Sequence, residues 1–171
     1  MKNANNVQDK ITTTLAQIRA HKPCEGGWKK LCKSLGGLRV YGEDTPLTFK
    51  QIYDSNGYED TLWCLRAVDK KYYPVWRHFA IDCAEGVKHL MTDGRSLNAL
   101  AVARKHADGK ATDVELAVAW DAAWAAARAA AGAGARAAAR AVAWAAARDA
   151  ARDAQIKLLF QFCRTGERVK K

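Results

Sequence analysis

The stretch ATDVELAVAWDAAWAAARAAAGAGARAAARAVAWAAARDAARDA, residues 111–154, decides the fold of this chain of 171 residues. It holds 24 alanines in 44 residues and contains no proline, serine or asparagine. Alanine has the highest helix propensity of all residues, so the stretch is expected to be helical on propensity alone. Thr112 and Glu115 form a capping-box sequence at its start. The sequence therefore predicts an all-α protein.

Two glycines, Gly132 and Gly134, interrupt this alanine-rich segment. Each costs roughly 1 kcal/mol relative to alanine inside a helix, but no turn-forming residues accompany them. We therefore predict one long, kinked helix over residues 111–163, with a helical hairpin at the glycines as the alternative. Its end is expected to dock onto a core through Ile156, Leu159, Phe160 and Cys163. The basic tail of residues 164–171 is expected to be mobile.

Residues 1–110 carry shorter segments in which apolar residues recur at helical spacing. The predicted helices span residues 6–20, 28–35, 48–56, 58–68, 73–91 and 95–107. A second capping-box sequence, Thr48 and Gln51, opens the third of them, and Asn56-Gly57 ends it. These segments predict a short-helix core, which forms one domain with the alanine-rich helix.

Two details of this core are also predicted. Residues 38–46 are expected to form a loop, with at most a two-residue bridge near Leu38–Tyr41. The helix at residues 95–107 is expected to bury Leu97, Leu100 and Ala101.

The chain is basic, with 28 Lys and Arg against 18 Asp and Glu and a formal net charge of +10. Residues 1–91 and 92–171 hold fourteen basic residues each, with ten and eight acidic ones, so no basic arm stands apart. A basic balance favours an anionic partner, either nucleic acid or an acidic protein surface. A merely solvated basic surface is the alternative.

Five cysteines are present, an odd number without a C-x-x-C motif. Cys32, Cys83 and Cys163 fall on apolar helix faces, which predicts small core residues in a reducing compartment. The first residues lack the apolar region of a signal peptide, and no uncharged apolar run approaches the roughly 18 residues that span a membrane. We therefore expect a cytoplasmic protein with no membrane partner.

Every fourth position of the alanine-rich segment from 120 to 152 is tryptophan or arginine, apart from Gly132. Its candidate partner-binding residues are Trp120, Trp124, Arg128, Arg136, Arg140, Trp144, Arg148 and Arg152. Because a helix has 3.6 residues per turn, this Trp/Arg spiral slips by about 40° at each step. Trp and Arg are enriched at binding hot spots, which favours a partner-binding surface. Low-complexity expansion, with arginines kept for solubility, and nucleic-acid binding are the alternatives.

Polar residues gather on one face of the predicted helix at residues 73–91: His78, Asp82, Glu85 and His89. Their pattern is E-x-x-x-H rather than the E-x-x-H of di-iron bundles, and it has no second copy, so a solvated polar face is favoured over a metal site. The sequence also lacks a G-x-S-x-G elbow and a glycine-rich phosphate loop. We therefore expect a protein that is not an enzyme and needs no cofactor or metal.

Three segments within residues 47–163 carry a resemblance to a known family. They are DTLWCLRAV (Asp60 to Val68), HLMTDGRS (His89 to Ser96) and ADGKATDVEL (Ala107 to Leu116), followed by the Ala/Arg/Trp repeat. The chain resembles a family of phages and mobile elements whose members are described as immunity proteins of polymorphic toxin systems. Residues 1–46 are less typical of that family.

The resemblance implies an all-α inhibitor that neutralises a protein by contact in the cytoplasm of a bacterial host, and it brings no catalytic residues. A small phage-borne inhibitor has host defence complexes, such as a CRISPR effector, as a second class of target. The expected partner is thus a toxin or a host protein complex with an acidic surface. Nucleic-acid binding is expected to be weak and blind to sequence, and the oligomeric state stays open.

Overall fold

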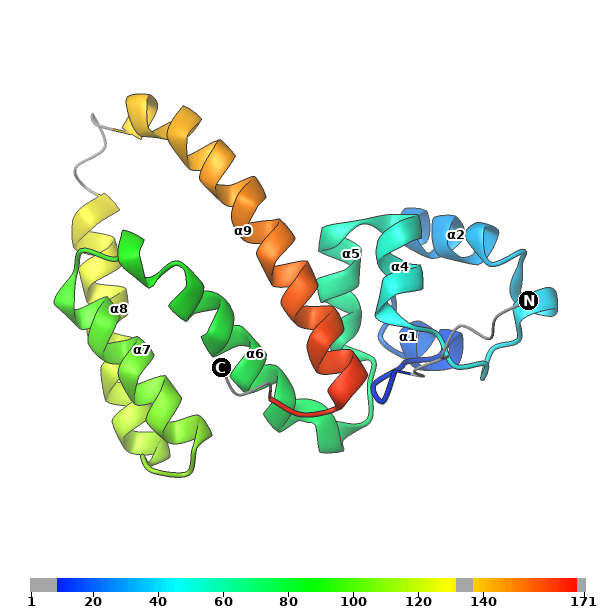
Figure 1. The fold of residues 1–171 in the computed structure, drawn as a ribbon, viewed down its shortest axis with the longest axis horizontal. Coiled ribbons are helices and arrows are strands. Elements are labelled where there is room, and N and C mark those ends of the chain that lie inside the picture. The colour runs from blue at the N-terminus through cyan, green and yellow to red at the C-terminus, as the bar shows by residue number, and fades with distance from the viewer. Residues whose placement is uncertain (1–8, 132–136, 169–171) are drawn as a thin grey trace, which may run out of the picture. The chain divides into compact units, whose positions relative to one another are not determined.

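The computed structural model describes residues 9–131 and 137–168, with the backbone alone for 126–131 and 137–147. Regular structure in this part of the chain is helical, and an isolated bridge is the only strand-like pairing in it (Figure 1). The prediction of an all-α fold is therefore confirmed.

The chain divides into two compact units, whereas the sequence was expected to form one domain. Unit 1 comprises residues 1–76 and 156–171, and unit 2 comprises residues 77–155. The N-terminal and C-terminal parts of the chain thus contribute to the same unit.

Unit 1 contains short helices from the first part of the chain. They are α1 (Leu15–Ala20), α2 (Glu25–Ser34), α3 (Leu38–Tyr41), α4 (Phe49–Asn56), α5 (Tyr58–Trp63), η1 (Cys64–Arg66) and η2 (Lys70–Tyr72). The start of α6 (Tyr73–Gly86) and the end of α9 (Ala137–Thr165) complete the unit. The predicted helix at residues 58–68 is therefore α5 followed by a single 3-10 turn.

Large apolar side chains build the core of unit 1. The fully buried ones include Ile11, Leu15, Ile18, Leu47, Phe49, Ile52, Leu159 and Phe162. The ring of Tyr53 in α4 meets Phe160 of α9 edge to face, with centroids 5.8 Å apart. Burial of one such side chain contributes about 1.5–3 kcal/mol. The predicted docking of the segment around Ile156–Cys163 is confirmed, although Phe162 rather than Phe160 is the fully buried aromatic.

The predicted helix at residues 6–20 is wrong for residues 9–14, whereas residues 6–8 lie outside the described residues. Thr13 and Leu47 form the isolated bridge, with N–H···O distances of 3.0 and 2.8 Å. Thr14 then caps α1, because its hydroxyl accepts the N–H of Gln17 at 3.1 Å. Threonines are β-branched and favour extended backbone, so the Thr12-Thr13-Thr14 run resists helix formation despite the helical spacing of its apolar neighbours.

The segment after α2 also differs from its prediction. Residues 38–41 form the helical turn α3, not a loop or a bridge, and the bridge lies at Thr13 instead. Glycines flank this turn, since Gly37 has φ +95° and Gly42 has φ +86°. Positive φ suits glycine, which lets the chain enter and leave a single turn sharply.

The first predicted capping box is confirmed at the start of α4. The Thr48 hydroxyl accepts the N–H of Gln51 at 3.2 Å, and the Gln51 side-chain oxygen accepts the N–H of Thr48 at 2.9 Å. The predicted stop is confirmed as well, because Gly57 follows α4 with φ +87°.

Unit 2 contains the longer helices. They are the remainder of α6, η3 (Lys88–Leu90), α7 (Gly94–Ala107), α8 (Asp113–Ala131) and the first part of α9. The predicted helix at residues 73–91 therefore ends early, at Gly86, where glycine lowers the propensity. The second capping box is confirmed: Glu115 Oε2 accepts the Thr112 N–H at 2.7 Å, and the Thr112 hydroxyl accepts the Glu115 N–H at 3.2 Å.

Helix α7 forms where the sequence predicts it but buries less than expected. It contains no fully buried residue: Leu97 and Leu100 are half-buried and Ala101 is exposed. Its apolar side chains therefore leave surface available for further packing.

Whether the alanine-rich segment is a kinked helix or a hairpin depends on residues 132–136, which lie outside the described residues. Helix α8 ends before these residues and α9 begins after them. Of the predicted mobile tail, Arg164 and Thr165 belong to the last turn of α9, and residues 169–171 lie outside the described residues. Within the described ranges, no helix has the length and apolar character needed to cross a membrane.

Candidate functional site

The Trp/Arg spiral is only partly within the described side chains. Trp120 and Trp124 lie in α8 and are 53% and 55% exposed. Near the end of the spiral, in α9, Arg148 is exposed and Arg152 is half-buried. The remaining predictions concern Arg128, Arg140 and Trp144, whose side chains are not described, and Arg136, which lies outside the described residues.

Trp120 and Trp124 line an apolar groove in unit 2. The groove has a volume of about 440 Å³ and is lined by α6, α7 and α8 together with Met91. Trp120 and Trp124 are four residues apart, so they share one side of α8. We call this feature the tryptophan groove. Two members of the predicted spiral thus become part of a concave surface formed with two other helices.

Alanine explains why this surface is hollow. Five alanines line the groove from all three helices: Ala80 and Ala84 from α6, Ala99 and Ala103 from α7, and Ala123 from α8. The pairs in α6 and α7 have i, i+4 spacing and therefore share one face of each helix. A methyl group fills little volume, so apolar space remains beside the large indole rings.

An ion cluster connects α6 to α7 in the same unit. Arg104 of α7 donates from Nε and Nη2 to the two oxygens of Glu85 at 2.9 Å each, and Nη2 also donates to Asp82. His78 Nδ1 lies 3.3 Å from Arg104 Nη1. Burial alone would lower the pKa of the Arg104 guanidinium, but its hydrogen bonds to Glu85 and Asp82 outweigh burial and raise this pKa. We call these four residues the Arg104 cluster.

The predicted solvated polar face on residues 78–89 is therefore wrong for Asp82. Its side chain is only 6% exposed and pairs with an Arg104 side chain that is 15% exposed. His89 is exposed in η3, outside α6. No set of three or more His, Cys, Asp or Glu side chains among the described residues could hold a metal ion. Arg104 was missed by sequence reasoning because it comes from another helix, 22 residues beyond Asp82.

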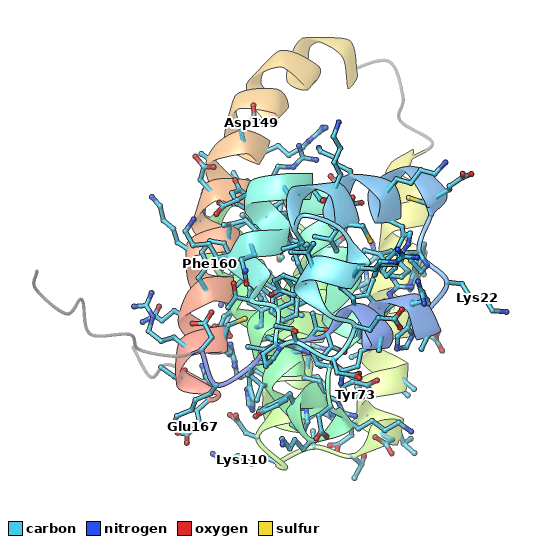
Figure 2. All side chains as sticks on the ribbon, turned by 90° about the vertical axis from the view of Figure 1, so that its right-hand side faces the viewer. Lys22, Tyr73, Lys110, Asp149, Phe160 and Glu167 are labelled. Carbon is cyan, nitrogen blue, oxygen red and sulfur yellow. The ribbon has the colours of Figure 1, made fainter. Side chains whose placement is uncertain are left out.

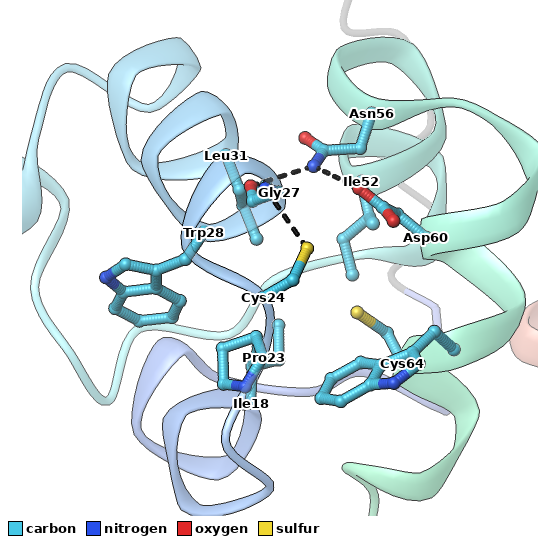
Figure 3. Close-up of a pocket in the computed structure, with 11 residues that line it drawn as sticks. Ile18, Pro23, Cys24, Gly27, Trp28, Leu31, Ile52, Asn56, Asp60 and Cys64 are labelled. Atoms are coloured by element: carbon cyan, nitrogen blue, oxygen red, sulfur yellow. Dashed lines mark hydrogen bonds between the residues drawn. The ribbon is translucent and has the colours of Figure 1, made fainter.

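Unit 1 has a smaller cavity of about 150 Å³, bordered by Cys24, Trp28 and Cys64 (Figure 3). At its edge the Asn56 Nδ2 donates to the Gly27 carbonyl at 2.9 Å and to Asp60 Oδ2 at 2.7 Å. These bonds join α2 to α4 and α5, so the cavity lies within a tightly held junction.

All five cysteines are free thiols, and they differ in how far they are buried. Cys64 and Cys163 are buried, and Cys24 is exposed. Burial raises the pKa of the Cys64 thiol to about 12 and that of Cys83 to about 11. The prediction of a core residue is thus confirmed for Cys163, whereas Cys32 and Cys83 are half-buried.

Comparison of the chain with protein-family models finds no match. Curated proteins and solved structures give no match either. The use of the tryptophan groove is therefore inferred from its own residues. Apart from the Ser96 hydroxyl and the indole N–H groups of Trp120 and Trp124, the side chains that line it are apolar.

Proposed function

We propose that the protein is a non-enzymatic inhibitor that binds a partner protein with fixed stoichiometry through the tryptophan groove. The observation that carries the proposal is the pair Trp120 and Trp124, each more than half exposed beside an apolar cavity of about 440 Å³. Tryptophan is the residue most typical of binding hot spots, which cluster in desolvated pockets.

The exposed indole surface is energetically large. A tryptophan buries on the order of 200 Å² when fully covered, and roughly half of that is still exposed here. At about 25 cal/mol per Å², covering it contributes about 2–3 kcal/mol per tryptophan before the costs of association. Two such residues at adjacent turns can therefore anchor a complex.

An amphipathic helix of the partner, with acidic residues beyond its apolar anchors, is the occupant that the groove favours. Grooves between helices accept an apolar helix face through anchors at i, i+3, i+4 and i+7, and the alanines permit close approach. Exposed Arg77 lies one turn before Ala80 in α6, and Arg128 follows Trp124 by one turn in α8. Both positions are basic, which favours acidic residues at the ends of the bound helix.

The class of target rests on the resemblance in sequence. An immunity protein and an inhibitor of a defence complex both act by covering a protein surface, so both agree with a groove that offers contact. We therefore propose an immunity-type or anti-defence inhibitor with an acidic target surface. The other residues of the Trp/Arg spiral, from Arg128 to Arg152, stay a prediction for an extended contact.

The test uses two double variants of α8. Trp120→Ala with Trp124→Ala removes both indoles, whereas Val114→Ala with Val118→Ala removes exposed apolar side chains (72% and 64% exposed) of the same helix that do not line the groove. Each protein is immobilised at equal density, proteins captured from a bacterial lysate are quantified by mass spectrometry, and each candidate partner is purified. Its affinity and stoichiometry are then measured by calorimetry, and its activity is titrated with the inhibitor.

The expected partner binds in a fixed ratio and is inhibited in the same ratio. Its affinity falls by at least about 30-fold in the tryptophan variant, because even a single hot spot is worth about 2 kcal/mol or more, and stays unchanged in the valine variant. Equal binding by both variants would exclude the groove as the docking site. Complete inactivation of a partner by a substoichiometric amount would instead indicate an enzyme.

A further inference from the structure

The two units differ sharply in charge, although the two halves of the sequence do not. Among the described residues, unit 1 carries 14 Lys and Arg against 9 Asp and Glu, whereas unit 2 carries 10 against 9. The described part of unit 1 therefore has a formal net charge of +5, and that of unit 2 has +1. The excess is hidden in the linear sequence because unit 1 is assembled from both ends of the chain.

We propose that a lysine face of unit 1, formed by Lys29, Lys30 and Lys33 on α2, binds the phosphate backbone of nucleic acid without reading its sequence. This activity goes beyond inhibition through the tryptophan groove and uses a different unit.

Helix geometry places these lysines together. At 100° per residue, Lys29, Lys30 and Lys33 fall within one arc of about 100° of α2. All three are exposed, while Leu31 on the opposite side is 3% exposed. Gly26 shares the basic arc and is also exposed, so no bulky side chain separates the lysines from a ligand.

Basic residues flank the face, and acidic residues do little to neutralise it. Lys22 precedes α2 and extends into solvent (Figure 2), and Arg39 follows it in α3. Glu25 pairs with Lys29 at the surface, but no described carboxylate forms an ion pair with Lys22, Lys30, Lys33 or Arg39. A polyanion can therefore replace mobile counterions at these positions.

The lysine face contains lysine rather than arginine, and this favours nucleic acid over an acidic protein as its ligand. Lysine is depleted in protein–protein interfaces, where arginine and aromatic residues dominate. Its ammonium group is a strongly hydrated point charge, and sequence-independent phosphate contacts draw their affinity from counterion release. The lysine face carries no apolar anchor, so it offers charge without the hot spot that a protein partner needs.

The probe is a short fluorescein-labelled DNA duplex, titrated with the full chain between about 50 and 200 mM salt and followed by anisotropy. The test variant is Lys29→Gln/Lys30→Gln/Lys33→Gln. The matched control is Lys88→Gln/Lys105→Gln/Lys110→Gln, which removes three exposed lysines from unit 2. Both triple variants lose the same charge, and glutamine keeps a helix propensity close to that of lysine.

Because Glu25 pairs with Lys29, the face is expected to neutralise two to three phosphates, so the parent should lose about 10- to 40-fold in affinity over this salt range. The α2 variant is expected to reduce the slope of log K against log salt by about 2–3, whereas the unit 2 control changes affinity less than about twofold. A duplex of scrambled sequence should bind equally well, and Trp120→Ala/Trp124→Ala should bind as the parent does. The nucleic-acid result and the protein-docking result are thus independent.

Three outcomes would overturn the proposal. They are no binding at the lowest salt, an equal loss in the unit 2 control, and competition by polyglutamate that matches unlabelled DNA at equal charge. The last result would assign the lysine face to an acidic protein.

Discussion

The two units of this protein are stabilised by different means. The largest fully buried side chains among the described residues, such as Phe49 and Phe162, all belong to unit 1. In unit 2, the buried side chains among the described residues are Phe79, Ile81, Asp82 and Ala119, and none of them is fully buried. Unit 1 therefore relies on apolar burial, while unit 2 combines high helix propensity with an ionic connection between helices.

This contrast explains where each unit is open to a partner. Most large apolar side chains of unit 1 are buried, with Val40 and Tyr73 as exposed exceptions, and charged residues such as those of the lysine face lie on its surface. Alanine in unit 2 fills little space, and the indoles of Trp120 and Trp124 remain at the surface. A single chain thus offers an apolar groove in one unit and a basic face in the other.

Arg104→Met is the substitution expected to have the largest effect on this contrast. It leaves the buried Asp82 carboxylate without its guanidinium partner, beside the like-charged Glu85. Breaking a buried ion pair in this way costs about 3–5 kcal/mol. The lower end is expected, because Glu85 is 38% exposed and partly hydrated. Urea denaturation followed by circular dichroism measures the loss.

The double variant Arg104→Met/Asp82→Leu separates charge from packing. Replacing both partners by apolar residues also removes the buried carboxylate that has lost its guanidinium, so most of the lost stability should return. If the double variant has the same free energy of unfolding as Arg104→Met, the charge of Asp82 is not the cause of the loss. Packing rather than charge would then hold α6 to α7, and the two units would not differ in what stabilises them.

Features that depend on local sequence were predictable. The alanine content of residues 111–154 indicates helix by propensity, and both capping boxes were recognised because their partners lie three residues apart. The stop at Gly57 follows from the ease with which glycine adopts positive φ. Each of these predictions needed only residues that are close together in the sequence.

Features that depend on contacts between distant segments were not predictable. The tryptophan groove needs α6, α7 and α8 side by side, and the sequence identified only the tryptophans of α8. The Arg104 cluster joins residues about 20 positions apart on two helices. At the N-terminus, helical spacing of apolar residues was misleading because the pairing of Thr13 with Leu47 favours extended backbone.

A second prediction concerns the tight junction in unit 1. A Cβ added at Gly27 would lie 2.9 Å from Asp60 Oδ2 and 3.1 Å from Cys24 Sγ. Asp60 is held in place by Asn56 at 2.7 Å, so it cannot withdraw without losing that hydrogen bond. Gly27→Ala is therefore expected to lower the free energy of unfolding by about 1–3 kcal/mol.

The neighbouring glycine provides the matched control. A Cβ at Gly26 meets nothing within 4 Å, and Gly26 belongs to the same helix. Gly26→Ala should therefore raise stability by about 0.4–1 kcal/mol, because alanine lowers the entropy of the unfolded chain. Both variants are compared by urea denaturation. Equal effects of the same sign would show that the approach of α2 to Asp60 is not tight.

The smallest expected effect compares the two capping boxes, one in each unit. Thr48→Ala and Thr112→Ala should each cost about 1 kcal/mol, the usual value for an N-cap. The boxes differ in their third residue after the cap, which is neutral Gln51 in unit 1 and ionisable Glu115 in unit 2. Hydrogen bonds from the Thr112 N–H and hydroxyl lower the pKa of Glu115 below its ordinary value of 4.5.

The sign of the pH dependence follows from that direction. A lowered pKa means that the Glu115 carboxylate stabilises α8 above about pH 4.5, and that this contribution is lost as the pH falls through the folded-state pKa. Hydrogen exchange of α8 amides should therefore accelerate in acid relative to a Glu115→Gln variant, after correction for intrinsic rates. Glutamine can accept the same bonds without titrating, as Gln51 does in α4. If parent and variant respond equally to acid, the charge of Glu115 contributes nothing to the cap, and the two boxes are equivalent despite their different units.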